Sequence, residues 1–161
     1  MRTLTLMRHA KSSWDDAAIA DHERPLNERG KKAAKTMAKR LKHSGYAPDL
    51  VIVSSAVRAQ QTAKALQTAY DDALKLRTEP TLYETPEDAY AEVIRHVDDG
   101  VKDLLIIGHN PTIEWIAAQL CSTPHRMPTA AYVRVEIPCH WRDFRFETFK
   151  ELDYDYPKSG R

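Results

Sequence analysis

The stretch Leu4-Thr5-Leu6-Met7-Arg8-His9 begins as a short apolar run and ends in a guanidinium and an imidazole. Such a run is typical of a short buried strand. Two later stretches repeat the arrangement, because the β-branched run Asp49–Ser54 is followed by Arg58 and the apolar run Leu104–Gly108 by His109. In open α/β sheets, ligands bind just beyond the carboxyl ends of the strands. We therefore expect three strands to bring basic side chains to one edge and to form an anion site there.

Helical patterns lie between these runs. Asn27 is the expected N-cap of a first helix that stops at Gly45, and Ser55 is expected to cap a second one. A third helix should follow Pro86, and Asn110 should cap a fourth, with a proline at its first position. Strands that alternate with helices in this way predict parallel βαβ units and therefore an α/β fold.

Three further segments complete the expected chain. Lys75–Thr81 is ambiguous and can form an edge strand that Pro80 stops. Ala131–Ile137 alternates as a strand does, and Phe144–Thr148 suggests an antiparallel partner for it. The polar chain from about residue 153 is expected to be loose. Residues 1–161 are expected to form a single domain, because this length suffices for one core.

The composition argues against several classes of protein. The 24 Lys and Arg residues against 23 Asp and Glu residues give a net charge of +1, which argues against a nucleic-acid or membrane surface. No apolar run approaches the ~20 residues that span a bilayer. The N-terminus runs straight into the first strand, so no signal peptide is expected. Cys121 and Cys139 are isolated from each other in sequence. We therefore expect a reduced, cytoplasmic protein, and a monomer.

Three motifs resemble those of the histidine phosphatase superfamily, which has the phosphoglycerate-mutase-like fold. Residues 8–15 (Arg-His-Ala-Lys-Ser-Ser-Trp-Asp) are similar to the family's first motif, Arg-His-Gly-x-Thr-x-Trp-Asn. Residues 54–63 are similar to its second motif and residues 108–110 (Gly-His-Asn) to its third. The small size and residues 24–26 and 128–131 most resemble the SixA-type phosphohistidine phosphatases. The resemblance implies a three-layer α/β/α fold with a mostly parallel sheet and a C-terminal antiparallel strand pair.

The same resemblance implies covalent chemistry at His9. A neutral imidazole can attack phosphorus, and two nearby guanidinium groups disfavour its protonation. Arg8, Arg58 and His109 would form the electrostatic pocket for the phosphoryl oxygens, over which charge spreads during phosphoryl transfer. The phosphorylated His9 would then be hydrolysed by water. This scheme requires no metal and no other cofactor.

Five further positions are candidates for substrate contact or proton transfer. Ser12 matches the family's small hydroxyl position, and Arg24 could contact the phosphate where the loop folds back. Many relatives use a carboxylic acid after the central edge strand, and Glu84 stands in about that place. Asp15 and Asp21 are its rivals as proton donor. Asp15 also replaces the family's usual Asn, which would put a negative charge near the phosphate unless the side chain points away.

Three functions remain open at this point. The leading one is hydrolysis of phosphohistidine in a protein, because a chain without large insertions leaves an open site that suits a protein surface. The second is hydrolysis of a small phosphomonoester, whose alkoxide leaving group needs a proton donor. The third is a noncatalytic phosphate-binding module, which would not need a nucleophile. The expected partner is therefore a phosphorylated protein or a small phosphoester, and neither a nucleic acid nor a membrane.

Overall fold

Six strands form one sheet in the computed structural model, which describes residues 1–161. They are β1 (Arg2–Arg8), β2 (Leu50–Ser54), β3 (Leu76–Glu79), β4 (Asp103–Gly108), β5 (Tyr132–Ile137) and β6 (Lys150–Asp155). Their order across the sheet is β3-β2-β4-β1-β5-β6. The first four strands along the chain are mutually parallel, whereas β5 runs antiparallel to β1 and β6 antiparallel to β5. The predicted mostly parallel sheet with a C-terminal antiparallel pair is thus confirmed.

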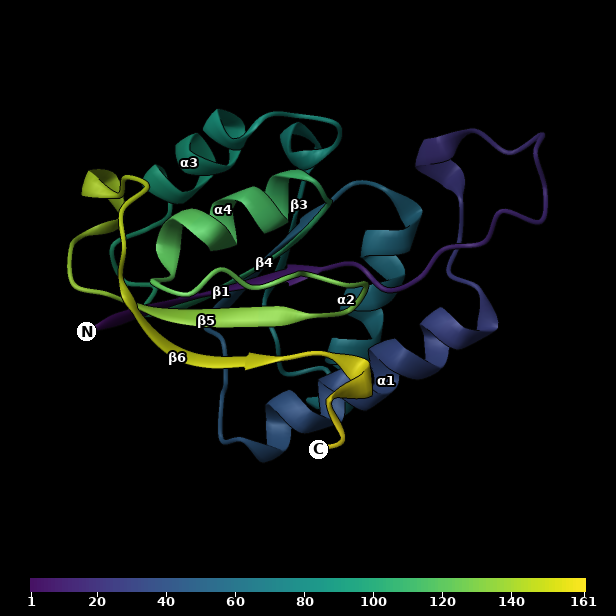
Figure 1. Cartoon of the computed structure of the whole chain (residues 1–161), viewed down its shortest axis with the longest axis horizontal. Helices are drawn as coiled ribbons and strands as arrows, with labels where there is room; N and C mark the ends of the chain where they lie inside the picture. Colours follow the sequence, from purple (N-terminus) through teal and green to yellow (C-terminus); the bar gives the residue numbers. More distant parts are fainter.

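Helices cover both faces of this sheet (Figure 1). They are α1 (Glu28–His43), α2 (Val57–Ala69), α3 (Glu87–Arg95) and α4 (Thr112–Leu120). Alternate residues of the central strands feed two separate cores, so that Leu4 and Leu6 pack with α3 and α4 whereas Met7 packs with α1 and α2. This period-two division gives the three layers that the sequence predicted. None of the four helices is long and apolar enough to cross a membrane.

The helix starts agree only in part with the expected caps. The Asn27 side chain accepts a hydrogen bond from the Gly30 amide at 2.7 Å and caps α1, as predicted. Ser55 does not cap α2, because its hydroxyl pairs with Nε2 of His22 at 2.9 Å instead and the helix begins two residues later. Asn110 does accept from a backbone amide of α4, that of Glu114 at 3.1 Å. The proline after it precedes the first helical residue rather than occupying it.

The partner of β5 is not the segment that the sequence suggested. β6 begins at Lys150, and the aromatic residues before it form a side-chain cluster instead of a strand. Phe144 is fully buried in the α3–α4 core, and its ring meets that of Phe146 edge-to-face at 5.8 Å. Core burial of these rings therefore explains their alternation, and the expectation of a strand over Phe144–Thr148 is wrong.

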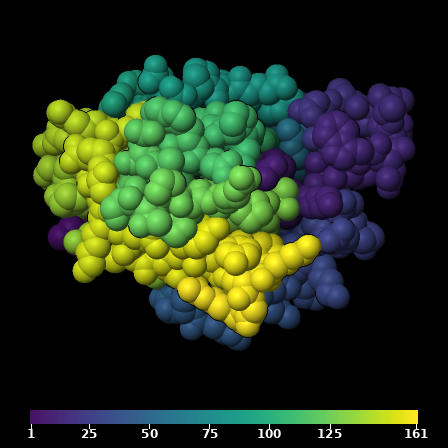
Figure 2. Space-filling model, viewed as in Figure 1, coloured from purple at the N-terminus to yellow at the C-terminus, as the bar shows by residue number.

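The C-terminal residues are docked on the body of the protein, which corrects the expectation of a loose tail from about residue 153. β6 extends to Asp155, whose side chain is only 1% exposed. Arg40 of α1 donates hydrogen bonds to this carboxylate at 3.3 Å and to the carbonyl oxygens of Tyr156 and Pro157, both at 3.1 Å. In Figure 1 the yellow C-terminal segment forms one edge of the sheet and ends beside α1, and in Figure 2 it lies against the body of the protein. The guanidinium of Arg40 therefore binds three successive residues of the C-terminal segment.

We expect Arg40→Ala to lower the free energy of unfolding by about 2–3 kcal/mol. The substitution leaves the carboxylate of Asp155 buried without its main cationic partner, and an unpaired buried charge is costly. Urea denaturation of the variant and of the wild type would measure the difference. Arg142→Ala, at an exposed position, is the matched control and should change stability little. Equal stability of Arg40→Ala and the wild type would show that the bonds of Arg40 to the C-terminal segment do not stabilise the protein.

Candidate active site

Three neighbouring strands deliver the basic side chains to one edge of the sheet. In the register of β1 and β4, Arg8 pairs with Gly108, so His9 and His109 leave adjacent strands side by side. Their ring centroids lie 5.0 Å apart. Arg58 comes from the first turn of α2, immediately after β2. The convergence expected from the three apolar runs is confirmed, because β1, β4 and β2 are consecutive in the sheet.

A cavity of about 300 Å³ opens at this edge. It is lined by ten residues, namely Arg8, His9, Lys11, Ser12, Trp14, Arg24, Arg58, His109, Asn110 and Thr129. Four of these side chains are Lys or Arg and none is Asp or Glu. Six of the nine candidates from the sequence line this cavity, whereas Glu84, Asp15 and Asp21 do not. The cavity is therefore suited to an anion.

The hydrogen bonds of His9 determine which of its ring nitrogens is free. Nδ1 lies 2.7 Å from the carbonyl oxygen of Ala10, which can only accept, so Nδ1 carries the proton. Nε2 of the neutral ring then holds a lone pair, and the Nε–H of Arg58 points to it from 3.4 Å. The backbone next to His9 is also held, because the amide of Ala10 donates to the hydroxyl of Thr62 at 3.0 Å. The ring is thus fixed with its unprotonated nitrogen towards an arginine.

The surroundings of both histidines disfavour their charged forms. Burial, with smaller contributions from the neighbouring basic groups, lowers the pKa of His9 to about 3. Burial, followed by the charge of Arg58, lowers the pKa of His109 to about 4. Both imidazoles are therefore neutral at pH 7 in the unliganded protein. A neutral imidazole is the form that can act as a nucleophile.

Two buried nitrogen atoms at the cavity have no hydrogen-bond partner in the protein. One is Nε of Arg8, whose Nη1 donates to the carbonyl oxygen of Met127 at 3.2 Å. The other is Nδ1 of His109, whose Nε2 lies 2.7 Å from the hydroxyl of Ser54. Buried polar groups are nearly always paired, so unpaired ones that line a cavity are candidates for binding a ligand. An oxyanion in the cavity would supply the acceptor that the Arg8 guanidinium lacks.

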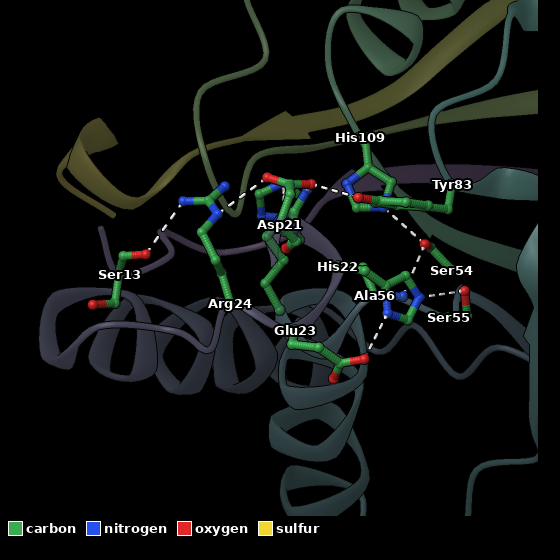
Figure 3. A network of polar contacts seen from close by, with 12 residues as sticks. Ser13, Asp21, His22, Glu23, Arg24, Ser54, Ser55, Ala56, Tyr83 and His109 are labelled. Carbon is green, nitrogen blue, oxygen red and sulfur yellow. Dashed lines mark hydrogen bonds and ion pairs between the residues drawn. The ribbon is translucent and has the colours of Figure 1, made fainter. Parts of the chain in front are cut away.

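Asp21 joins the loop after β1 to the rest of the site (Figure 3). Arg58 donates to its backbone oxygen at 2.8 Å and to its carboxylate at 3.1 Å. The carboxylate also accepts from the hydroxyl of Tyr83 at 2.6 Å and from Nε of Arg24 at 3.1 Å. These bonds, that from Tyr83 first, lower the pKa of Asp21 to about 2. Asp21 is therefore an anion that orients two arginines, and it is poorly suited to the expected alternative role of proton donor.

Ser12 and Arg24 both line the cavity. Ser12 is buried and its backbone bridges to Leu26, which closes the loop over the cavity. The Arg24 guanidinium stacks on the exposed ring of Trp14, at 3.4 Å from the ring centroid, and its Nη1 donates to the carbonyl oxygen of Ser13. The stacking and the ion pair together hold Arg24 at the cavity wall.

The two remaining acid candidates stand outside the cavity. Asp15 is exposed on the loop, and its backbone amide donates to the hydroxyl of Ser13. Glu84 is exposed in the bend before α3 and lines an adjacent cavity of about 380 Å³, which shares Arg58 and His109 with the first one. Glu84 can therefore approach a leaving group that extends into this second cavity.

Sequence reasoning did not identify two contributors to the site. Tyr83 donates to Asp21, and its ring lies edge-on to that of His109, with centroids 5.6 Å apart. Ser54 positions His109 through its hydroxyl. Ser54 stands at the end of a predicted strand, which was a usable signal. Tyr83 had none, because the turn that aims it depends on tertiary packing.

We expect the two neutral histidines to make the protein less stable in acid. A base whose pKa is lower in the folded state binds its proton in the unfolded state first, so stability falls as the pH drops below about 6.5. The loss between pH 7.5 and 5 should be about 1–2 kcal/mol smaller in His9→Gln than in the wild type. Urea denaturation at both pH values, in phosphate-free buffer, measures this. His96→Gln, at an exposed position, is the control. If all three proteins lose the same free energy of unfolding between pH 7.5 and 5, His9 is not held neutral.

The structure contains no group of three or more His, Cys, Asp or Glu side chains that could hold a metal ion.

A comparison with protein families gives a match over residues 4–92 to the histidine phosphatase superfamily (branch 1). The chain belongs to the histidine phosphatase superfamily. The matched residues include His9 and Arg58, and the strand register then places His109 beside them.

Individual relatives match the chain over most of its length. Phosphohistidine phosphatase SixA of Escherichia coli is 28% identical over 138 residues, which are 82% of this chain and 83% of SixA. A crystal structure from Agrobacterium tumefaciens, provisionally named a SixA phosphohistidine phosphatase, superposes with a TM-score of 0.83 at 26% identity and covers 97% of this chain and 98% of the other. An uncharacterised chloroplastic protein of Arabidopsis thaliana is 30% identical over 80% of this chain, which spans only 63% of that relative. The two relatives that carry the SixA name confirm the SixA-type fold and support phosphatase activity.

Proposed function

We propose that this histidine phosphatase hydrolyses phosphohistidine in a protein substrate through a covalent intermediate on His9. The observation that carries the proposal is the neutral His9 ring, with Nδ1 bonded to the Ala10 carbonyl and Nε2 facing an arginine in an anion-binding cavity. A binding module would not need a nucleophile fixed in this way. The similarity to SixA from Escherichia coli supports the choice of substrate.

In the first step the lone pair of His9 Nε2 attacks the phosphorus of the substrate. The new N–P bond forms as the N–P bond of the substrate breaks, and the electron pair returns to the leaving imidazole. Arg8 and Arg58 stabilise the charge on the equatorial oxygens, and Nδ1 of His109 adds a contact when it carries the ring proton. The hydrogen bond from Nδ1 of His9 to the Ala10 carbonyl stabilises the positive charge that develops on the attacking ring.

In the second step water attacks the phosphorus of phosphorylated His9. The bond to Nε2 breaks, its electron pair returns to the ring, and inorganic phosphate leaves after the attacking water has lost a proton to solvent. The ring is again neutral, with Nδ1 still bonded to the Ala10 carbonyl. The same cationic side chains serve both steps, because each step passes through a similar arrangement of phosphoryl oxygens.

The acid groups of the site favour phosphohistidine over a phosphomonoester. An alkoxide leaving group needs a proton, whereas a leaving imidazole can depart protonated or take a proton from solvent. The cavity has no Asp or Glu in its lining, and Asp21 is held as an anion. Glu84 of the neighbouring cavity is the one acid near the path of a leaving group. A small phosphomonoester that reaches Glu84 is the second candidate substrate.

Glu84→Gln distinguishes these two substrates. We expect the variant to hydrolyse phosphohistidine with kcat/KM within about threefold of the wild type, because that leaving group needs no acid from the enzyme. Hydrolysis of an alkyl phosphomonoester, if the enzyme performs it, should fall by about a hundredfold or more. The two rates are measured by phosphate release with each substrate. Glu79→Gln, on edge strand β3, is the control. A large loss with phosphohistidine would make Glu84 the general acid and favour the phosphomonoester.

The covalent step is tested by intact mass after rapid mixing with a phosphohistidine donor and quenching without acid. The wild type should gain one phosphoryl group transiently (~80 Da), and His9→Ala should not. An adduct of equal yield in His9→Ala would show that another residue is the nucleophile. A folded wild type that binds phosphate but forms no adduct and releases no phosphate would support the noncatalytic module instead.

We further propose that the protein is a cytoplasmic monomer. Cys121 is buried and Cys139 half-buried, and both are free thiols, as a reducing compartment would keep them. Light scattering after size-exclusion chromatography would refute the monomer if it gave twice the mass of one chain. Recovery of the protein outside the cytoplasmic fraction would refute the location.

A further inference from the structure

A third hollow lies between α1 and α2, on the outer side of that helix layer. Its volume is about 470 Å³. The apolar side chains in its lining are those of Leu26, Ala34, Ala65 and Ala69. Three of these four are alanines, so the two helices leave room between them for larger side chains from another molecule. We call this feature the α1–α2 groove.

Lysines form the rim of the α1–α2 groove. Lys31, Lys35 and Lys39 follow one another at intervals of four on α1, and Lys64 stands opposite on α2. All four are exposed. The only acidic residue on either helix is Glu28, which lies 3.3 Å from Lys31. The rim therefore has three lysines without a carboxylate partner within 4 Å, although the net charge of the whole chain is only +1.

The groove lies close to the cavity that is lined by His9 and Arg58. Leu26 belongs to the groove, and its backbone bridges to Ser12 of the cavity. Along α2, Arg58 of the cavity and Lys64 of the rim are six residues apart, which is roughly 9 Å along a helix axis at about 1.5 Å per residue. A segment in the groove could therefore be part of the same molecule that presents a phosphoryl group to His9.

We propose that the α1–α2 groove docks an acidic amphipathic helix of the protein that carries the phosphohistidine. The inference rests on the proposed function, because it assigns the groove to that substrate. Apolar side chains of the helix would enter between the alanines, and acidic residues on its flanks would face the lysines. The four-residue spacing of Lys31, Lys35 and Lys39 matches the spacing of side chains on one face of a partner helix.

Other occupants fit these features less well. A second copy of the chain would bring two lysine rims together, and like charges oppose that contact. A nucleic acid would pair with the lysines but would leave the apolar floor unused. An anionic lipid surface is flat, whereas the apolar residues lie in a hollow between two helices. An acidic helix uses both the charge and the apolar floor.

The test compares two phosphohistidine peptides as substrates of the full-length protein. The helix probe joins the phosphohistidine through a short Gly/Ser linker to an amphipathic helix of about 18 residues, with leucines on one face and glutamates on its flanks. The scrambled probe has the same composition without the apolar face. We expect a KM about tenfold lower for the helix probe with kcat unchanged, because docking adds binding energy without touching the reacting atoms.

Charge reversal of the rim should remove this advantage. In Lys35→Glu/Lys39→Glu/Lys64→Glu the two probes should have equal KM, and kcat for the scrambled probe should match the wild type. The matched control, Lys75→Glu/Lys102→Glu/Lys150→Glu, reverses three exposed lysines elsewhere and should keep the tenfold difference. Equal KM for both probes in the wild type, or an advantage that survives rim reversal, would overturn the proposal.

Direct binding separates failure of the docking site from failure of the proposed function. Fluorescence anisotropy with the unphosphorylated helix probe should show binding that is at least about tenfold weaker in the rim variant. If neither peptide is hydrolysed but this rim-dependent binding persists, the proposed activity fails and the groove still binds an acidic helix. Absence of binding overturns the groove whatever the turnover. Tighter rim-dependent binding of a DNA duplex or of phosphatidylglycerol vesicles would overturn the assignment to a protein helix.

Discussion

His9→Ala is expected to lower kcat for phosphohistidine hydrolysis by about ten-thousandfold or more. The variant loses Nε2 of His9, whose lone pair faces Nε of Arg58 at 3.4 Å. Without this atom the covalent intermediate cannot form. Removal of a catalytic nucleophile typically costs this much, because the remaining electrostatic groups sustain only a small residual rate. Phosphate release in single-turnover and steady-state experiments measures the loss.

Binding of phosphate provides the internal check for this variant. Arg8, Arg58 and His109 remain, so phosphorus NMR titration with inorganic phosphate should give a dissociation constant within about fivefold of the wild type. His96→Ala, which removes an exposed imidazole outside the cavity, should keep full activity. If His9→Ala retains more than about a tenth of the wild-type kcat, the nucleophile is not His9.

Arg58→Lys is expected to lower kcat/KM by about a hundredfold to a thousandfold. The guanidinium reaches Nε2 of His9 with one nitrogen while the other two donate to Asp21. A lysine keeps the charge but has a single nitrogen, so it cannot hold both partners. A misplaced donor at a phosphoryl group costs transition-state stabilisation of this size. The ratio is measured with phosphohistidine below its KM.

The position rather than the charge of Arg58 is what this prediction tests. Arg77→Lys, on exposed edge strand β3, makes the same exchange away from the site and should have no effect on kcat/KM. Arg58→Lys should also release Asp21 from two of its hydrogen bonds and so loosen the loop after β1. A loss of less than about fivefold would show that a cation at this place suffices and that the bonds to Asp21 are not needed.

The convergence of basic side chains at the candidate active site could be predicted from the sequence because it depends on local patterns. Each of the three apolar runs is a strand, and parallel strands joined through helices must present their carboxyl ends at the same edge of the sheet. His9 and His109 directly follow those ends, and Arg58 follows its strand by four residues, so their meeting required only the strand order β2-β4-β1. The cap of α1 was also local, and Asn27 bonds to a backbone amide as expected. Asn110 bonds to an amide of α4, but the capping position of that helix is Pro111, one residue later than expected.

The C-terminal segment could not be predicted in the same way. Alternation of Phe144 and Phe146 has the period of a strand, but these rings are packed by distant residues of the α3–α4 core. The polar strand β6 has an exposed pattern that local sequence does not distinguish from a tail. Its place is decided by pairing with β5 and by the bonds of Arg40, more than a hundred residues earlier in the chain.

The sequence by itself determined the α/β fold and the edge of the sheet at which Arg8, His9, Arg58 and His109 meet, because strand ends and motif spacing are properties of short segments. Only the tertiary structure decided the role of Asp21, which changes from a candidate acid to a fixed anion when Tyr83 and two arginines surround it. It also decided that three lysines of α1 border the α1–α2 groove. Both outcomes depend on which distant side chains come within a few ångströms of each other, and that is set by packing rather than by local pattern.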